Sequence, residues 1–307
     1  MTLSLDREPR ADPPARVTTA NVKLRQRVGE IWAARELLAA MVRKELKVKY
    51  KNSALGFVWS LLNPVMYLVI FYLVFSVFLK NGIPLFPIWL LSGLLVWNFM
   101  SMVVPGATGS VLANSALVKK IAFPREILPL SNVGAGLVHF FLQMTVLLAG
   151  LVAFQHGIDV GFLALVPLAV VTMVVLAAAL GVLLAAVNVY VRDAGHLVEL
   201  ALLAWFWLTP IAYPFRQVSD TLPGHGIPFW LLNINPVTPI VTVFQRAFYN
   251  RTSVLLSNGK DRLPLLPDVG IRWHLTFLLA VLIGSIVVLV VSMRLFRRLE
   301  GNFAEAL

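Results

Sequence analysis

The chain has 307 residues, of which 59% are hydrophobic and only 13% are charged, and its mean hydropathy is +0.81. Soluble globular domains contain about 45–50% apolar and about 25% charged residues, so this composition excludes an ordinary soluble enzyme. The net charge of +11 would favour nucleic-acid binding in a soluble chain, but here it indicates a surface beside anionic lipid. The sequence therefore predicts a polytopic membrane protein that binds no nucleic acid.

Long windows without Asp, Glu, Lys or Arg recur along the chain. A spanning helix needs about 20 largely apolar residues, because a charge at mid-bilayer costs about 2.5–3.5 kcal/mol on insertion scales. We therefore predict an all-α polytopic fold with six transmembrane helices, near residues 55–79, 87–112, 131–154, 163–187, 197–215 and 274–293.

The basic residues indicate how these spans are oriented. An even number of spans places both termini on one side of the membrane, and that side holds 19 of the 26 Lys and Arg residues. Because an excess of basic residues marks the cytoplasmic side, we predict a multi-pass protein with both termini in the cytoplasm.

The N-terminal region divides into a tail and a helix. Residues 1–29 are rich in charge and proline and lack the apolar segment of a signal peptide, so we predict a disordered cytoplasmic tail. Residues 30–307 are predicted to form one transmembrane domain, beginning with a helix over residues 31–51 that has an apolar and a charged face. Such a helix lies in the membrane interface, either as a plain lipid anchor or as an anchor that also contacts a cytoplasmic partner.

Residues 216–273 form a long outer loop that is rich in proline, asparagine and glycine. Within it, Thr238 as N-cap and Pro239 at the first helical position predict a short helix that ends near Tyr249. This helix is too short to span a bilayer. It therefore either re-enters the membrane beside other protein or lies on the membrane surface.

The sequence lacks the residues of several kinds of catalytic site. It has no cysteine and no P-loop, since its only Gly-Lys pair, Gly259-Lys260, is followed by Asp261. The five histidines are scattered, so we predict no metal site and assign no catalytic residue. Glu199 lies at the cytoplasmic edge of the fifth span, either as an interfacial carboxylate or as a functional acid.

Two patterns within the spans predict contacts between helices. His139 and Gln143 lie four residues apart and fit a hydrogen bond to another helix, with a proton relay or ligand contact as the alternative. Ala177, Gly181 and Ala185 form a ridge of small residues on the fourth span, and such a ridge lets another helix approach closely.

Aromatic residues gather in or beside two of the spans. They are Tyr67, Phe71, Phe75 and Phe78 on one side of the first span, and Trp205, Phe206, Trp207, Tyr213 and Phe215 in or near the end of the fifth. One reading is lipid-facing or interfacial packing. The other is the lining of a passage, because aromatic rings offer apolar contact to sugar rings while Tyr and Trp keep a polar tip.

Three stretches in a fixed order carry a resemblance to a known family. They are KVKYKNSALGFVWSLLNP at residues 47–64, VKKIAFPREILP at 118–129, and LTPIAYP at 208–214 followed by NPVTP at 235–239. Together they resemble the permeases of ABC-2 type polysaccharide exporters, which export O-antigen, capsule, teichoic acid or mycobacterial galactan.

The resemblance implies a transport subunit of a bacterial inner membrane rather than an enzyme. Two copies form a homodimer for a lipid-linked polysaccharide, and two copies of a separate ATPase bind below it. ATP and Mg²⁺ belong to that ATPase, so this chain binds no cofactor. The 118–129 segment resembles the family's coupling helix. The implied coupling residues are Lys119, Lys120, Phe123, Pro124, Arg125 and Glu126, with Arg192 and Asp193 as a second contact that fits an ordinary loop equally well.

The resemblance also assigns the remaining site residues. The aromatic residues of the first and fifth spans, Phe206 and Phe215 excepted, become the substrate path. The outer loop supplies a gate with Pro236, Pro239 and Arg246. Arg35, Arg43, Lys51 and Trp59 lie in or beside the interface helix, where the basic side chains are available to a lipid pyrophosphate.

Two other functions stay open at this point. The chain fits an ABC-2 permease for drugs or small lipids. It could also be a membrane-embedded glycan-processing enzyme, although such an enzyme needs paired carboxylates or a metal site that the sequence does not display. Arg outnumbers Lys by 17 to 9, which indicates a GC-rich source, and with the family resemblance this favours an actinobacterial galactan precursor or an O-antigen-like glycan.

Overall fold

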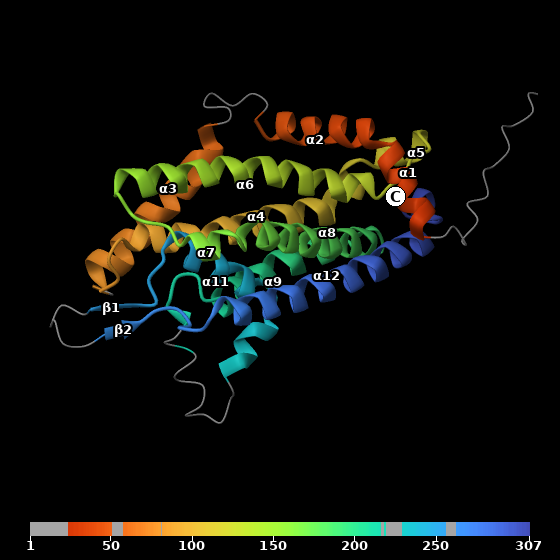
Figure 1. Cartoon of the computed structure of the whole chain (residues 1–307). Coiled ribbons are helices and arrows are strands. Elements are labelled where there is room, and N and C mark those ends of the chain that lie inside the picture. Colours follow the sequence, from red (N-terminus) through yellow and green to blue (C-terminus); the bar gives the residue numbers. More distant parts are fainter. Residues whose placement is uncertain (1–23, 51–57, 81, 216–217, 219–228, 256–261) are drawn as a thin grey trace, which may run out of the picture.

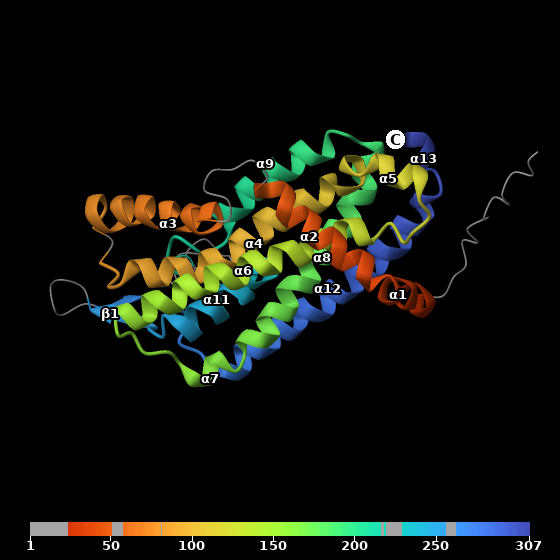
Figure 2. The same cartoon turned by 90° about the horizontal axis from the view of Figure 1, so that it is seen from above.

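The structure is a computed structural model that describes residues 24–50, 58–80, 82–215, 218, 229–255 and 262–307. Its long helices run side by side along one axis (Figure 1). One end of the bundle, the terminal end, holds α1 (Leu24–Ala33), α5 (Ser115–Lys120), α13 (Phe303–Ala306) and the C-terminus (Figure 2). The opposite end, the ribbon end, holds the π-helix η2 (Tyr72–Phe78) and the strands β1 (Ser253–Leu255) and β2 (Arg262–Pro264).

Four helices are long and apolar enough to cross a membrane by length and composition. They are α4 (Phe86–Ala113), α6 (Ile127–Ala153), α8 (Val166–Tyr190), which the short α7 (Val160–Leu163) precedes, and α12 (Ile271–Glu300). They coincide with the second, third, fourth and sixth predicted spans. The predicted helical membrane fold is therefore confirmed.

The first and fifth predicted spans correspond to shorter apolar helices. The first consists of α3 (Trp59–Phe71) continued by η2, and the fifth is α9 (Ala194–Leu208). The prediction that the fifth span extends to residue 215 is wrong, because Thr209 is extended, with φ −105° and ψ 128°. Thr209 precedes Pro210, and the residue before a proline is disfavoured in a helix.

α4 lies at the centre of the bundle, in contact with α6, α8, α9 and α11 (Val237–Phe248). The predicted ridge of small residues is confirmed, because a Cβ at Gly181 would lie 2.7 Å from the Cβ of Ala107 on α4. A contact this close leaves no room for a side chain, so α8 packs almost backbone to backbone against α4 at this point.

The predicted interface helix is two helices, α1 and α2 (Arg35–Tyr50), separated by a turn at Ala34. The prediction that the tail is disordered as far as residue 29 is wrong, because α1 begins at Leu24. α2 crosses over α6 (Figure 2), and a Cβ at Gly134 of α6 would lie 2.6 Å from Val42. The apolar side of α2 therefore covers protein at this crossing.

The predicted outer loop contributes η4 (Phe229–Ile234), α11 and the short antiparallel ribbon, in which Ser253 pairs with Pro264. The prediction was an all-α fold, and among the described residues this ribbon is the part that differs from it. α11 begins two residues earlier than predicted, and the side chain of Asn235, not Thr238, accepts the Val237 N–H at 3.1 Å. Eleven of its twelve residues are buried, so α11 lies inside the bundle.

Candidate functional site

A cleft of about 400 Å³ lies between α3, α4 and α9. Apolar and aromatic side chains make up most of its wall, and a few polar groups interrupt them. The lining residues are Tyr67, Phe71, Leu94, Trp97, Asn98, Ser101, Pro105, Glu199, Leu202, Leu203, Phe206 and Trp207. A concave apolar wall with a few polar groups is the usual form of a small-molecule site.

Phe206 joins the aromatic residues of the cleft wall into one connected set. Its ring lies 6.2 Å from that of Phe71 in an edge-to-face arrangement, 5.5 Å from Trp97 and 5.2 Å from Trp207. Aromatic pairs at such separations gain about 0.5–1.5 kcal/mol beyond the burial of their area. The wall is therefore held in shape by contacts between its own rings.

Three of the seven residues predicted for the substrate path, Tyr67, Phe71 and Trp207, line this cleft. Phe75 and Phe78 do not. Phe75 stacks against Phe71 at 5.7 Å, and Phe78 is 74% exposed in η2. The first span thus presents two of its four predicted aromatic residues to the cleft.

Trp205 and Tyr213 hold the end of α9 in place instead of lining the cleft. Trp205 Nε1 donates a hydrogen bond to Asn235 Oδ1 at 2.8 Å, and the Tyr213 hydroxyl donates to the carbonyl oxygen of Trp207 at 2.7 Å. The first bond ties α9 to the segment that enters α11, and the second ties the end of α9 to the residues that directly follow it.

The polar groups of the cleft come from α4 and α9. Asn98 donates to Gln143 Oε1 at 3.0 Å, which confirms the hydrogen bond between helices that was predicted for Gln143. Ser101 lies one turn along α4, and Glu199 brings an exposed carboxylate from α9. Aromatic faces beside hydrogen-bonding groups suit a sugar chain, whose rings stack while its hydroxyls donate and accept.

The predicted coupling segment is not one helix over residues 118–129. α5 ends at Lys120, Ile121 is extended (φ −128°, ψ 136°), and α6 begins at Ile127. Pro129 therefore lies in the first turn of α6, where a proline is tolerated because its missing N–H would have no helical partner. The surface that this segment exposes consists of Lys119, Lys120, Ile121 and Ala122, with Ile121 55% exposed.

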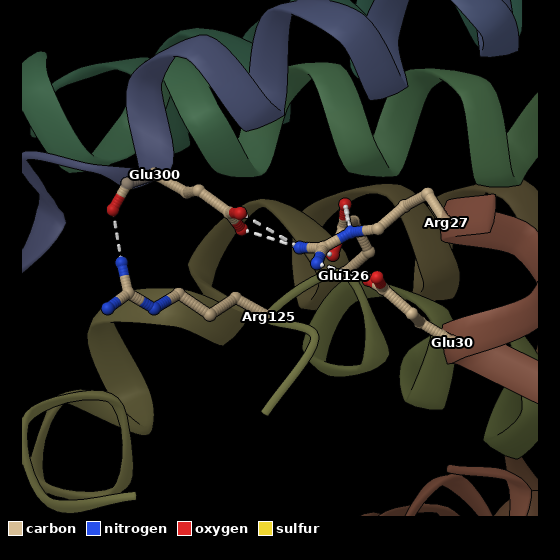
Figure 3. A network of polar contacts seen from close by, with 5 residues as sticks. All are labelled: Arg27, Glu30, Arg125, Glu126 and Glu300. Carbon is tan, nitrogen blue, oxygen red and sulfur yellow. Dashed lines mark hydrogen bonds and ion pairs between the residues drawn. The ribbon is translucent and has the colours of Figure 1, made fainter. Parts of the chain in front are cut away.

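The end of the same segment turns inward rather than toward a partner. Glu126 is 0% exposed, and both its carboxylate oxygens accept hydrogen bonds from Arg27 at 2.8 Å (Figure 3). Arg125 donates to the main-chain oxygen of Glu300, and Phe123 packs against the apolar cluster at the terminal end. These three predicted coupling residues therefore contact their own chain.

Arg27 is the hub of this charged cluster, which consists of Arg27, Glu30, Arg125, Glu126 and Glu300 (Figure 3). Burial alone would lower the pKa of Arg27, but its hydrogen bond to Glu126 and the charges of Glu126 and Glu300 raise that pKa above its ordinary value. The guanidinium therefore stays charged while it is buried.

The other predicted residues near the terminal end lie on or near the surface. Arg192 and Asp193 are exposed in the turn between α8 and α9, Arg35 and Arg43 are exposed on α2, Trp59 is 46% exposed at the start of α3, and Pro124 is half-buried. Lys51 lies outside the described residues.

The residues predicted for an outer gate belong to α11. Pro236 stands at its N-cap position and Pro239 is buried in its first turn. The Arg246 guanidinium lies 4.4 Å from the centre of the Phe162 ring, a distance typical of cation–π contacts. Burial lowers the pKa of Arg246, while nearby Asp159 and Asp268 act in the opposite direction.

Several polar atoms around α11 are buried without a hydrogen-bond partner. Within the described part of the chain these atoms belong to η2, η4, α11 and the first turns of α4 and α12. They are Ser76 Oγ, Trp89 Nε1, both side-chain polar atoms of Asn233 and Gln245, Thr238 Oγ1, Arg246 Nε and His274 Nε2. Gln245 and Thr238 are both 0% exposed. Each such atom costs about 1–3 kcal/mol while it stays unpaired.

Sequence reasoning left out several residues that the structure brings to these sites. Arg27 stood in the predicted tail, although Leu24, Val28 and Ile31 have the spacing of one helix face and could have revealed α1. Trp97 of the cleft also went unassigned, whereas Phe206 belongs to the aromatic set expected at the fifth span. Among the residues that the structure describes, no group of three His, Cys, Asp or Glu side chains is arranged to hold a metal ion.

The chain is similar to known proteins over a range that includes the cleft and the predicted coupling segment. Residues 36–249 match the ABC-2 type transporter family. Over 280 residues the chain is 31% identical to the O-antigen export system permease protein RfbA of Myxococcus xanthus, covering 91% of this chain and 98% of that protein. It is also 26% identical over 287 residues to proteins of the same name from Klebsiella pneumoniae, covering 94% of this chain and 100% of theirs.

Proposed function

Because the chain belongs to the ABC-2 type transporter family, we propose that it is the membrane permease of an ATP-driven polysaccharide exporter. The observation that carries this function is the nearly full-length similarity to O-antigen export permeases, which includes the cleft and the coupling segment. The chain is a transport subunit and not an enzyme. ATP and Mg²⁺ bind to the separate ATPase subunit of the same exporter.

The substrate in this proposal is a lipid-linked polysaccharide, with a cell-wall galactan or an O-antigen-like glycan as the favoured class. Its sugar chain passes along the cleft, where Tyr67, Phe71 and Trp207 give flat apolar contacts. Stacking on rings is tolerant of sequence and register, because each sugar presents an apolar face. Glu199 and Asn98 then bond hydroxyl groups of the passing chain.

The proposed assembly is a homodimer of this chain with two copies of the ATPase at the terminal end. This places the terminal end and both termini in the cytoplasm of a bacterial cell, with the ribbon end outside. Lys119, Lys120, Ile121 and Ala122 form the contact surface for the ATPase, because they are the exposed part of the coupling segment. Arg192 and Asp193 extend that surface from the next turn.

The decisive experiment is depletion of the protein in its host, followed by extraction of lipid-linked glycans from the two leaflets. We expect finished polymer to accumulate on the cytoplasmic leaflet and to decrease at the cell surface. Loss of polymer without accumulation would mean that the chain takes part in synthesis. Unchanged glycans with an altered distribution of drugs or phospholipids would point to the other class of ABC-2 permease.

Two sets of variants test the parts of this proposal separately. Lys119→Glu with Lys120→Glu should reduce co-purification of the ATPase, whereas Arg294→Glu, an exposed charge reversal on α12, should not. Trp207→Ala should slow export while the ATPase stays bound, and Phe154→Ala, which removes a ring that is 56% exposed on the surface, serves as its control. Equal effects of a variant and its control would refute the assignment.

A further inference from the structure

We infer that Arg27 is a positioning residue for energy coupling: it joins the coupling segment to α12 and to α1, so that movement imposed by the ATPase reaches all three elements together. This inference rests on the proposed function. It is based on a cluster of charged residues that are distant in the sequence. Arg27 lies 99 residues from Glu126 and 273 residues from Glu300.

The geometry makes Arg27 a three-way junction. Its Nε and Nη2 atoms each donate to one oxygen of Glu126 at 2.8 Å, and Nη2 also lies 2.8 and 2.9 Å from the two oxygens of Glu300. Nη1 donates to Glu30, one turn away on α1, at 2.9 Å. Glu126 immediately precedes α6 and Glu300 is the last residue of α12. One side chain thus contacts three separate elements (Figure 3).

Burial makes this junction stiff. The side chains of Arg27 and Glu300 are each 13% exposed and that of Glu126 is 0% exposed. Charge-assisted hydrogen bonds in such surroundings are short and strong, and separating a buried pair leaves an uncompensated charge. The elements that carry these three charges therefore resist moving apart.

A second contact links the same segments in parallel. Arg125 donates to the main-chain oxygen of Glu300, and its guanidinium lies 5.9 Å from the centre of the Phe303 ring. Phe303 packs edge-on against Phe296 of α12 at 5.3 Å. Both arginines thus fasten the end of α12 to the segment that follows the exposed Lys119 and Lys120.

The position of the cluster connects the proposed ATPase surface to the long helices. Only residues 121–125 separate the exposed end of α5 from Glu126, and α6 starts at the next residue. α12 packs along α8, which in turn packs against α4 of the cleft. A displacement of the coupling segment is therefore transmitted to α6 and α12 at once, instead of being absorbed by a loose turn.

The test uses variants that keep the charge or the shape of the cluster. Arg27→Lys retains the charge but offers one nitrogen in place of the planar fork, so it cannot bond Glu126 and Glu300 in the same way. Glu300→Gln keeps the shape and removes a charge. Arg298→Lys and Glu36→Gln are the matched controls, because both side chains are exposed and lie outside the cluster.

The readout is the amount of lipid-linked glycan exported per ATP hydrolysed by the complex of permease and ATPase, in cells and in reconstituted vesicles. We expect Arg27→Lys and Glu300→Gln to assemble and to hydrolyse ATP near the wild-type rate. Their export per ATP should fall by about five-fold or more, the lower range of typical coupling between sites. The controls should keep the wild-type ratio.

Other results would overturn the inference. If export and ATP hydrolysis fall in proportion to the amount of folded complex, Arg27 has only a structural role. If both variants keep the wild-type ratio, the cluster does not transmit movement. If depletion of the wild-type chain leaves the lipid-linked glycans unchanged, the proposed function itself fails, and the coupling role of Arg27 fails with it.

Discussion

The terminal end of the bundle and the region around α11 bury polar groups in opposite ways. At the terminal end, Glu126 is buried and Arg27 and Glu300 are mostly buried, and each has a hydrogen-bonded partner at 2.8 Å. Around α11, the side chains of Gln245 and Thr238 are buried with polar atoms that have no partner. Separating the paired charges at the terminal end would cost free energy, because each would be left buried without a partner. The unpaired atoms around α11 already cost free energy in the folded protein.

The two arrangements respond differently when their elements separate. Separating the elements of the terminal end leaves charges unpaired in the interior, so that end moves as one piece. Moving α11 away from its neighbours lets water reach atoms that lack partners, so the free energy lost in packing is partly offset by new hydrogen bonds. The predicted gate residues Pro236, Pro239 and Arg246 belong to α11 or to its N-cap position.

The largest expected effect is the loss of Arg27. Arg27→Ala leaves Glu126 buried without its partner, which should destabilise the protein by about 3–5 kcal/mol. The measurement is the midpoint of thermal unfolding in detergent. Arg298→Ala removes an exposed arginine from α12 and should change stability by less than about 0.5 kcal/mol. Similar midpoints for the two variants would contradict a tightly paired cluster.

Tyr249 offers a pH test of the α11 region, because it is a buried polar group there that does have a partner. Its hydroxyl donates to the carbonyl oxygen of Pro84 at 2.7 Å, and burial raises the pKa of Tyr249 to about 12. In the unfolded chain a tyrosine ionises near pH 10. Above that pH the unfolded state releases a proton that the folded state retains, so stability should fall as the pH rises from about 10 to about 12.

The measurement is the difference in unfolding midpoint between the wild type and Tyr249→Phe at pH 8 and at pH 11. The advantage of the wild type should be present at pH 8 and should shrink at pH 11, because the phenylalanine variant has no such proton. A difference that does not change with pH would mean that Tyr249 is not enclosed in the folded protein.

The sequence predicts best those features that depend on neighbouring residues. The long spans follow from windows without charge, because the cost of burying a charge in lipid applies residue by residue. The cleft was predictable only in part. Tyr67 and Phe71 lie on the expected helix face, but η2 begins at Tyr72, and its i→i+5 pattern turns Phe75 and Phe78 away from a face drawn for an α-helix.

The charged cluster could not be predicted, because its members are distant in sequence. Arg27 and Glu300 come from opposite ends of the chain and meet only after α1 and α12 have packed at the terminal end. Glu126 was expected to be a surface charge, since nothing in its local sequence marks it as buried. The burial of α11 was hidden for the same reason: it depends on contacts with α4, α8 and α12.

Two glutamines allow a direct comparison between a side chain without a hydrogen-bond partner and one that has a partner. Gln245 has no partner, whereas Gln143 accepts a hydrogen bond from Asn98 at 3.0 Å. Gln245→Met, which keeps the volume, should stabilise the protein by about 1–2 kcal/mol because it removes unpaired polar atoms. Gln143→Met should destabilise it by about 1 kcal/mol, since Asn98 loses its acceptor. Thermal midpoints that shift in the same direction would show that Gln245 is paired or hydrated in solution.

The smallest expected effect concerns the two threonines of α11. Thr238 Oγ1 has no partner, whereas Thr242 Oγ1 donates to the carbonyl oxygen of Pro239 at 3.1 Å. Thr238→Val should raise the unfolding midpoint by the equivalent of about 1 kcal/mol, because it exchanges an unpaired hydroxyl for a methyl group of similar size. Thr242→Val should leave stability unchanged or lower it by a similar amount. If Thr238→Val instead lowers the midpoint, that hydroxyl is satisfied in the resting protein, and α11 is held in the bundle as firmly as the terminal end.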